Sequence, residues 1–570
     1  MSGVRACEAL RRARLGAASA ALLTLSAVAY DPHAEAAEPK RALGLVLATL
    51  CLALCIVWTP RFRSDHRVAS AGIGFLGVST FSALWGLPAG LRDLGTLFVA
   101  LGAAWLGASL GPFSARSAAR LAALGIGGFS GCFALCSAVR GGSPLSLHGG
   151  QGNPNWLGLL LAVTLPLSLD ALVALRRERR SCRVIAIAAS AAQIPALYLS
   201  HSRVAWLVTG VTGFVFLLGL RRRLLVRKRS VVVGVGVLLV LMASATRSAQ
   251  DIPLGQALGG RIWIWEHSAR AAASAFPCGS GLGRFAHAYL DEQGAALRAL
   301  PERQAARRFL NATTAHDDYL QAAVESGAVS AILLALTLLF GVQSALRQRW
   351  FGGALSLLAC LLTALADSPL RQPAIALLVG LVLGAPSQLR GRKTLKGYPR
   401  LVPGLLLVLV AFLTRDAVRG WLGTRERSLA LEGEPARRLA RLTRAARLDP
   451  GSGETELELG LARLRLGDSR AGLEALTRAD ALFADTATRI AIGQAELELG
   501  HPAQAARAFE RALAWNSGSY RAHLGLAEAR FHEQRLEEAE REVRLAHSLL
   551  PGAPGARELL DRIREVQMDR

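Results

Sequence analysis

Charged residues are scarce in this 570-residue chain. They make up 19% of it, hydrophobic residues make up 52%, and soluble proteins average about 25% charged residues. This shortage excludes a wholly soluble protein and intrinsic disorder. The net charge is nevertheless +24. Because acidic and basic residues nearly balance from about Arg425 onward, the positive excess lies in short runs between apolar segments. That placement is typical of inner-membrane proteins and argues against nucleic acid as a partner.

The sequence also lacks the motifs of common soluble enzymes and metal sites. It has no Cys-x-x-Cys pair, no His-Glu-x-x-His and no phosphate-binding loop ending in Gly-Lys-Ser/Thr. The 8 cysteines are widely scattered, which excludes a disulfide scaffold. Candidate functional residues must therefore be sought in the polar turns between the hydrophobic segments.

Long hydrophobic runs dominate the first 420 residues. A run of about 17–25 apolar residues can cross a bilayer as a helix, and this criterion predicts about thirteen spans. The predicted spans are 14–30, 42–58, 69–90, 94–112, 117–139, 154–175, 183–200, 204–220, 229–245, 318–345, 350–366, 371–387 and 400–418. The expected fold class is all-α, with a polytopic transmembrane helical bundle of about 12–13 spans over residues 1–420. An Arg-rich start and Ala34–Ala37 leave open that the first span is a cleaved signal.

The basic residues of the short loops predict the orientation of the chain. With the N-terminus in the cytoplasm, most of the loop Lys and Arg fall on the cytoplasmic side, as the positive-inside rule requires. The segment of about residues 246–316 and the C-terminal tail then lie outside. The predicted location is the bacterial inner (cytoplasmic) membrane, with the tail in the periplasm.

The last part of the sequence, residues 424–570, is repetitive. A Gly or Gln recurs about every 34 residues, and an Ala follows each of them twelve positions later. The pairs are Gly433 and Ala445, Gly467 and Ala479, Gly500 and Ala512, and Gln534 and Ala546. This period predicts a C-terminal tetratricopeptide-type α-solenoid. Such an array could bind a protein partner or serve as a spacer or stabilising scaffold, and the repeat pattern leaves both open.

Two polar motifs lie where the chain re-enters the membrane at the predicted outer face. The glycine-rich turn 149–155 holds Asn153 and Asn155, which could contact a ligand or simply cap the next helix. The second motif, Ser200-His-Ser-Arg203, opens another span. Arg203 could anchor this helix at the membrane surface. The positive-inside rule disfavours arginine at this face, however, and this favours a functional role.

Two further motifs lie in and just after the predicted outside segment. Gly259-Gly-Arg261-Ile-Trp-Ile-Trp265 places a basic residue in an amphipathic aromatic stretch. His316, Asp317, Asp318 and Tyr319 follow at the mouth of the next predicted span. A histidine with acidic neighbours can act as a general base or proton carrier, although a lone histidine is more often structural.

These motifs, in their order among the spans, resemble the O-antigen ligase and polymerase (Wzy-like) family over about residues 40–420. The resemblance is carried by Gly-Asn-Pro-Asn before a span, Ser-His-Ser-Arg-x-Ala-Trp, Gly-Arg-x-x-x-Trp, the turn from Pro277 to Phe285, and Ala-His-Asp-Asp-Tyr-Leu-Gln followed by Glu-Ser-Gly. A tetratricopeptide tail is common in this family. The ligase pattern prefers Asn or Ser where Asp317 stands and a different small residue where Ser330 stands, which leaves the acceptor open.

The resemblance implies an enzyme that moves a glycan from a polyprenyl diphosphate carrier to an acceptor hydroxyl, without a metal or cofactor. Arg203 and Arg261 would stabilise the diphosphate leaving group, because a guanidinium contacts phosphate with two N–H groups and stays charged. His316 would be the general base, with Asp317 or Asp318 orienting the imidazole. The residues expected to bind substrate are Asn153, Asn155, Asp317, Asp318 and Tyr319.

The acceptor decides among related activities. Lipid A-core as acceptor would make the protein a ligase of lipopolysaccharide biosynthesis, a growing glycan would make it a Wzy-type polymerase, and a periplasmic protein would make it a protein O-oligosaccharyltransferase. A polysaccharide transporter is a further alternative, but transporters usually hold charged groups at the bilayer midplane, where these spans have few. The expected partners are the lipid-linked glycan, the acceptor, membrane lipids and, through the repeats, a protein.

Overall fold

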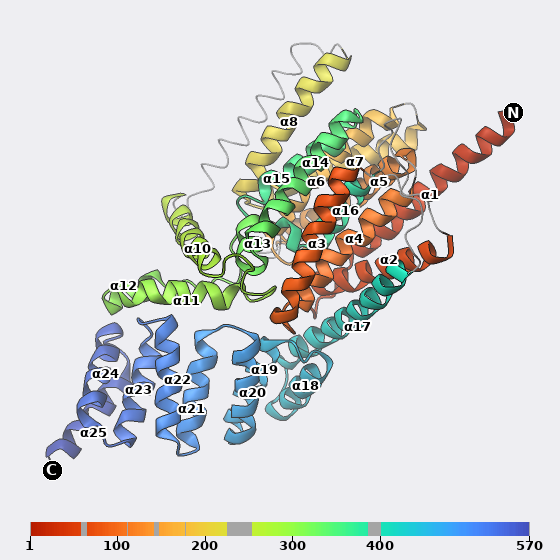
Figure 1. The fold of residues 1–570 in the computed structure, drawn as a ribbon. Coiled ribbons are helices and arrows are strands. Elements are labelled where there is room, and N and C mark those ends of the chain that lie inside the picture. Colours follow the sequence, from red (N-terminus) through yellow and green to blue (C-terminus); the bar gives the residue numbers. More distant parts are fainter. Residues whose placement is uncertain are drawn as a thin grey trace.

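The computed structural model describes residues 2–58, 65–110, 112–141, 147–176, 178–224, 254–385 and 401–568. Every regular element in these ranges is helical, so the predicted all-α class is confirmed. Figure 1 shows a bundle of long helices and, beyond one end of it, a row of short helix pairs. The long helix α17 leads from the bundle into this row. We call the end of the bundle that faces the row the solenoid end.

The bundle consists of apolar helices. Their bounds are α1 (Ser2–Val28), α2 (Ala37–Trp58), α3 (His66–Gly86), α4 (Leu91–Ser109), α5 (Pro112–Val139), α6 (Pro154–Leu175), α7 (Arg180–Leu199), α8 (Arg203–Leu224), α14 (Ala328–Arg347), α15 (Phe351–Thr363), α16 (Pro373–Gly384) and α17 (Leu401–Ala430). Among the described residues, 6 helices, α3 to α7 and α14, are long and apolar enough to cross a membrane. The chain is therefore a multi-pass membrane protein, as its sequence predicts.

The structure corrects the predicted span 318–345. Gly327 divides this segment into a short helix α13 (Asp318–Ser326) and the long helix α14. Gly327 has a φ of 86°, a conformation that glycine adopts far more readily than other residues. A Cβ atom there would lie 2.0 Å from the carbonyl oxygen of Pro277. The spanning helix thus begins at Ala328, and α13 lies outside it, at the solenoid end of the bundle.

The last predicted spans also differ from the observed helices. The segments 350–366 and 371–387 form helices of only 13 and 12 residues, α15 and α16, which is about 20 Å each against a hydrocarbon core of about 30 Å. The short 3-10 helix η3 (Pro369–Arg371) lies between them. The predicted domain boundary at residues 420–424 falls inside the continuous helix α17, and the predicted span 229–245 lies outside the described residues.

The row of short helices at the C-terminal end is the predicted solenoid. Its helices are α18 (Pro435–Leu448), α19 (Gly453–Arg465), α20 (Ser469–Leu482), α21 (Thr486–Glu498), α22 (Pro502–Trp515), α23 (Tyr520–His532), α24 (Leu536–Leu549) and α25 (Pro554–Met568). Helices α18, α20, α22 and α24 each begin two residues after the repeated Gly or Gln, and the repeated Ala of each is fully buried. The small Ala lets paired helices pack closely, and the repeat prediction is confirmed.

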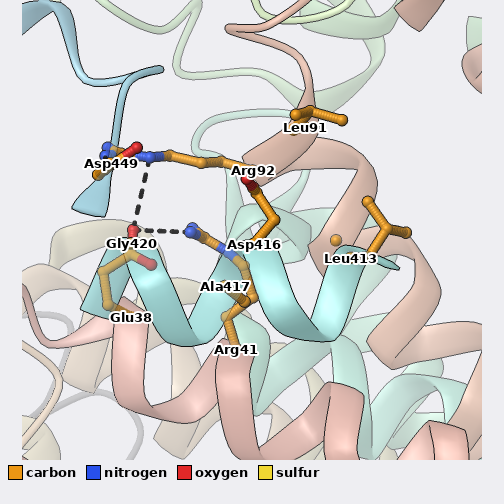
Figure 2. A pocket seen from close by; sticks show the side chains of 10 residues that line it. Glu38, Arg41, Leu91, Arg92, Leu413, Asp416, Ala417, Gly420 and Asp449 are labelled. Atoms are coloured by element: carbon orange, nitrogen blue, oxygen red, sulfur yellow. Dashed lines mark hydrogen bonds and ion pairs between the residues drawn. The ribbon is translucent and has the colours of Figure 1, made fainter. Parts of the chain in front are cut away.

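A buried network of charges connects the bundle to the start of the solenoid (Figure 2). Glu38 of α2 accepts a hydrogen bond from Nη1 of Arg41 at 2.7 Å and lies 3.8 Å from Nε of Arg92 in α4. Arg92 also bonds the carboxylate of Asp449, which follows α18. Because these groups are largely withdrawn from water, the network holds the first repeat against the membrane helices.

A layer of four helices lies at the solenoid end of the bundle, and two of them, α11 and α12, separate the bundle from the solenoid (Figure 1). Its members are α10 (Leu254–Ser274), α11 (Phe285–Arg298), α12 (Glu302–Arg308) and α13. Helices α10 to α12 lie in the described part of the predicted outside segment, which begins at residue 254, and α13 follows it. They carry Arg261 and surround the segment with His316, so this layer places two of the candidate residues at the solenoid end.

Candidate functional site

Asp367, in the turn between α15 and η3, brings three of the predicted site residues together. Its carboxylate accepts a hydrogen bond from Nδ2 of Asn155, lies 3.6 Å from Nη2 of Arg261 and lies 3.7 Å from Nδ1 of His316. The backbone N–H of Ser368 donates to the same carboxylate at 2.8 Å. The Asp367 side chain is only 3% exposed. We call this group of residues the Asp367 site.

The start of α6 explains the position of Asn155. Pro154 occupies the first turn of this helix, and the side-chain oxygen of Asn153 accepts a hydrogen bond from the N–H of Asn155 at 2.8 Å. Asn153 is therefore a helix cap, one of the two roles that its sequence context leaves open. The side chain of Asn155 remains available, and it bonds Asp367.

Arg261 is anchored to the turn that carries Asp367. Its Nη1 donates a hydrogen bond to the carbonyl oxygen of Ala366, and its Nη2 lies beside Asp367. The side chain is 28% exposed. The guanidinium thus has a fixed position on one side and an accessible surface on the other, which suits a residue that contacts an anionic group.

His316 has an unusual backbone conformation. Its φ is 50°, which costs of order 1 kcal/mol for a residue other than glycine and persists only when the surroundings hold it. Its Nδ1 is buried and has no hydrogen-bond partner among the described residues, whereas the side chain as a whole is 41% exposed. A carboxylate beside Nδ1 favours the tautomer that carries its proton there, and this leaves Nε2 able to accept a proton.

The charge state of Asp367 follows from its contacts. Burial raises the pKa of this carboxyl. The contacts with His316, the N–H of Ser368 and Asn155 lower it by more than burial raises it, so the pKa of Asp367 lies below the ordinary value. Asp367 is therefore ionised at neutral pH. An ionised carboxylate here stabilises a positive charge on the imidazole and balances the charge of Arg261.

Neither Asp317 nor Asp318 faces His316, so the expectation that one of them orients the imidazole is wrong. Asp317 caps α13, since its Oδ1 accepts from the N–H of Leu320 at 2.8 Å. Asp318 is buried, and its Oδ2 accepts from the N–H of Leu370 at 3.0 Å. The chain direction at the start of α13 turns both side chains toward backbone groups.

Asp318 and Tyr319 hold the turn that contains Asp367. The N–H of Asp318 donates to the carbonyl oxygen of Ala364 at 2.8 Å, and the hydroxyl of Tyr319 donates to that of Leu361 at 3.1 Å. Burial raises the pKa of Asp318 to about 8. The protonated form therefore predominates at neutral pH. That these two residues bind substrate stays a prediction.

Arg203 begins α8 at the same end of the bundle. The preceding residue, Ser202, packs closely on α6, because a Cβ atom on Gly158 would lie 2.6 Å from the Cβ of Ser202. Gly158 is about one helical turn beyond Asn155. The first turns of α6 and α8 are thus neighbours, and Arg203 lies at the end of the bundle that holds Asp367.

A second cluster of charged residues, centred on Arg371 four residues beyond Asp367, was not predicted. Nη2 of Arg371 lies 2.5 Å from the carboxylate of Asp93 and 3.3 Å from that of Glu325. The N–H of Gly283 donates to the same Glu325 oxygen at 3.2 Å. A sequence signal that both clusters share is Asp367-Ser-Pro-Leu-Arg371, a polar break between two apolar runs.

Comparison with known families identifies two parts of the chain. Residues 188–335 match the family model described as O-antigen ligase. The chain carries an O-antigen ligase domain. Residues 490–554 match a tetratricopeptide repeat model. The ligase match contains Arg203, Arg261 and His316, whereas Asn155 and Asp367 lie outside it.

Three solved structures illustrate the similarity of this chain to known structures, each at low sequence identity. The crystal structure of MamA is 20% identical, with a TM-score of 0.24, and the match covers 26% of this chain and 84% of that chain. The APC/C hetero-tetramer Cut9-Hcn1 is 13% identical, with a TM-score of 0.24 and coverages of 85% and 96%. Yeast Tom70 is 10% identical, with a TM-score of 0.21 and coverages of 87% and 96%. No curated protein matches the chain.

Proposed function

We propose that this protein transfers a glycan from a polyprenyl diphosphate carrier to an acceptor hydroxyl at the periplasmic face of the bacterial inner membrane. The O-antigen ligase domain supports a glycan transferase of the lipopolysaccharide type. The observation that carries the specific reaction is the convergence of Arg261 and His316 on the buried carboxylate of Asp367. A general base, its orienting carboxylate and an anion-binding guanidinium are the groups that this transfer needs.

In the proposed reaction His316 acts on the acceptor. The ionised carboxylate of Asp367, 3.7 Å from Nδ1, favours the tautomer with the proton on Nδ1, and Nε2 removes the proton of the acceptor hydroxyl as its oxygen attacks the anomeric carbon. The bond between this carbon and the diphosphate oxygen breaks, and its electron pair leaves with the polyprenyl diphosphate. The proton on Nε2 then passes to the departing diphosphate or to water, which restores the neutral imidazole.

Arg261 and Arg203 stabilise the leaving group in this proposal. The negative charge that develops on the bridging oxygen must be balanced, and a guanidinium can do this with two parallel N–H contacts. Arg261 is held for this task by Ala366 and Asp367. Arg203 lies in the first turn of α8, next to the start of α6 that carries Asn155. These side chains account for the reaction without a metal or cofactor.

The test is transfer by the purified full-length chain in liposomes that contain a polyprenyl diphosphate glycan. Lipid A-core, a second lipid-linked glycan and a periplasmic acceptor protein are each offered in turn. We expect glycosylated lipid A-core as the product and its loss in Arg203→Ala, Arg261→Ala and His316→Ala. A longer lipid-linked glycan would assign the same site to a polymerase, and a glycoprotein would assign it to a protein glycosyltransferase. Movement of the glycan across the membrane without a new glycosidic bond would overturn the proposal.

A further inference from the structure

The solenoid is occupied along one side by helices of the same chain. Helices α11 and α12 lie across the repeats, at the ends of α22 and α24 (Figure 1). The indole Nε1 of Trp515, the last residue of α22, donates a hydrogen bond to Oδ1 of Asp291 in α11 at 2.7 Å. Nε of Arg303 in α12 donates to the carbonyl oxygen of Ser548 at 3.0 Å. The contact therefore involves two successive repeats.

The backbones at this contact approach so closely that side chains are excluded at two positions. A Cβ atom on Gly294 of α11 would lie 2.2 Å from the carbonyl oxygen of Ala514. A Cβ atom on Gly518, in the turn after α22, would lie 2.2 Å from the backbone N of Ala306 in α12. One glycine lies on each side of the contact. The surface of α11 and α12 and the surface of the repeats around α22 are therefore complementary in shape.

Trp515 itself is held rigidly. It is only 2% exposed, and the Cζ atom of Arg489 lies 3.1 Å from the centroid of its ring. Arg489 is in turn fixed by Asp480, whose Oδ1 accepts from its Nε at 3.0 Å. A guanidinium over an indole face stabilises the ring electrostatically. The tryptophan is therefore a fixed point of the solenoid surface.

The apolar core around Trp515 continues to the Asp367 site. This core contains Trp515 of the solenoid, Tyr289 of α11, Ile264 of α10 and Ala315, all of them buried. Ala315 directly precedes His316. Ile264 lies three residues, about one helical turn, after Arg261. One continuous cluster thus connects the solenoid to the backbone next to both candidate residues.

Gln293 makes the same connection through hydrogen bonds. This fully buried side chain lies in α11, two residues beyond Asp291. Its Oε1 accepts from Nε1 of Trp263 at 3.1 Å and from the N–H of Leu310 at 2.9 Å, while its Nε2 donates to the Leu310 carbonyl oxygen at 3.1 Å. Helix α11 thereby binds both α10 and the segment that leads to His316.

We infer that the solenoid holds the layer of helices α10 to α13 in position. Trp515 and Asp291 are positioning residues that fix α11 and, through it, Arg261 and His316. The solenoid thus binds α11 and α12 of its own chain, in addition to any separate protein that it binds. The catalytic consequence rests on the proposed function. The mechanical consequence, that Trp515 orders residues 309–317, does not depend on it.

The experiment compares Trp515→Ala and Asp291→Ala with two controls in the full-length protein. Asp291→Asn keeps an oxygen that can accept the indole hydrogen bond. Ile563→Ala creates a cavity in α25, in a separate apolar cluster of the solenoid. Amide hydrogen exchange of residues 309–317 is measured for each variant, together with kcat and KM for glycan transfer. Because the Asp291 side chain is exposed, its truncation leaves the fold intact even where Trp515→Ala unfolds the repeats.

We expect both alanine variants to exchange faster at residues 309–317 and to lose about 10- to 100-fold in kcat, as a displacement of about 1 Å in catalytic groups can cause. Asp291→Asn should stay near the wild type. Ile563→Ala should lower the melting temperature of the solenoid without changing exchange at 309–317 or kcat. Unchanged exchange in both alanine variants would refute the inference that the solenoid orders residues 309–317. Faster exchange with unchanged kcat would refute the inference that this order positions the catalytic residues. A wild-type protein that transfers no glycan would refute the proposed function. The exchange data would still show whether the solenoid orders residues 309–317.

Discussion

The substitution Asp367→Asn removes one charge from the centre of the Asp367 site and nearly preserves its shape. The amide oxygen can still accept the hydrogen bond from the N–H of Ser368. The variant no longer stabilises an imidazolium on His316, however, and it places no negative charge beside Arg261. The fold should therefore survive a change that disables the chemistry.

The distance between the two groups sets the size of the effect. Unit charges separated by the 3.7 Å between Asp367 and Nδ1 of His316 interact by about 1–4 kcal/mol for an effective dielectric constant between about 80 and 20. The buried carboxylate favours the upper part of this range, and the 41% exposure of the histidine favours the lower part. Each 1.4 kcal/mol corresponds to a factor of about ten in rate. We expect kcat to fall by about 10- to 10³-fold.

The assay is the initial rate of glycan transfer in liposomes at saturating donor, with thermal unfolding measured in parallel. Asp170→Asn is the matched control. Oδ2 of Asp170 accepts from Nε of Arg120 at 2.7 Å and from Nε1 of Trp350 at 3.1 Å. It is a similar carboxylate on α6, but it lies 15 residues, about 22 Å, beyond Asn155. Its loss should lower stability and leave kcat within a few-fold of the wild type.

A double variant identifies the route of the effect. If Asp367 acts through His316, then combining Asp367→Asn with His316→Ala should cost no more activity than His316→Ala alone, because residues that act as a unit are not additive. The reasoning is refuted if Asp367→Asn retains more than about a third of wild-type kcat, or if the two losses multiply.

Two further predictions concern stability. Arg92→Ala should lower the free energy of unfolding by about 3–5 kcal/mol, because it leaves the buried Glu38 with one cationic partner fewer and releases Asp449; an unchanged melting temperature would show that this network does not join the two parts. Asp318 has a pKa of about 8 in the folded chain and about 4 in an unfolded one. Between these values the folded state keeps a proton that the unfolded chain has lost, so stability falls as pH rises from about 4 to about 8. Asp318→Asn cannot ionise and should lose less melting temperature than the wild type between pH 5 and pH 9; identical pH profiles would contradict the burial argument.

Local patterns in the sequence were sufficient to predict much of this protein. Helical spans follow from the length of apolar runs, and the solenoid follows from a 34-residue period that places small residues at each helix contact. The polar turns at one predicted face pointed to Arg261 and His316. These signals lie within one element or repeat at regular spacing, so they can be read without knowledge of the neighbouring segments.

The tertiary structure alone decided which residues face one another. Asp317 and Asp318 follow His316 in the sequence, yet both bond backbone groups, while the carboxylate beside the imidazole comes from Asp367, 51 residues beyond His316. The contact between Trp515 and Asp291 joins residues that are 224 positions apart. Helix geometry fixes the direction of neighbouring side chains, but the pairing of distant segments depends on how whole helices pack. No local spacing records that choice.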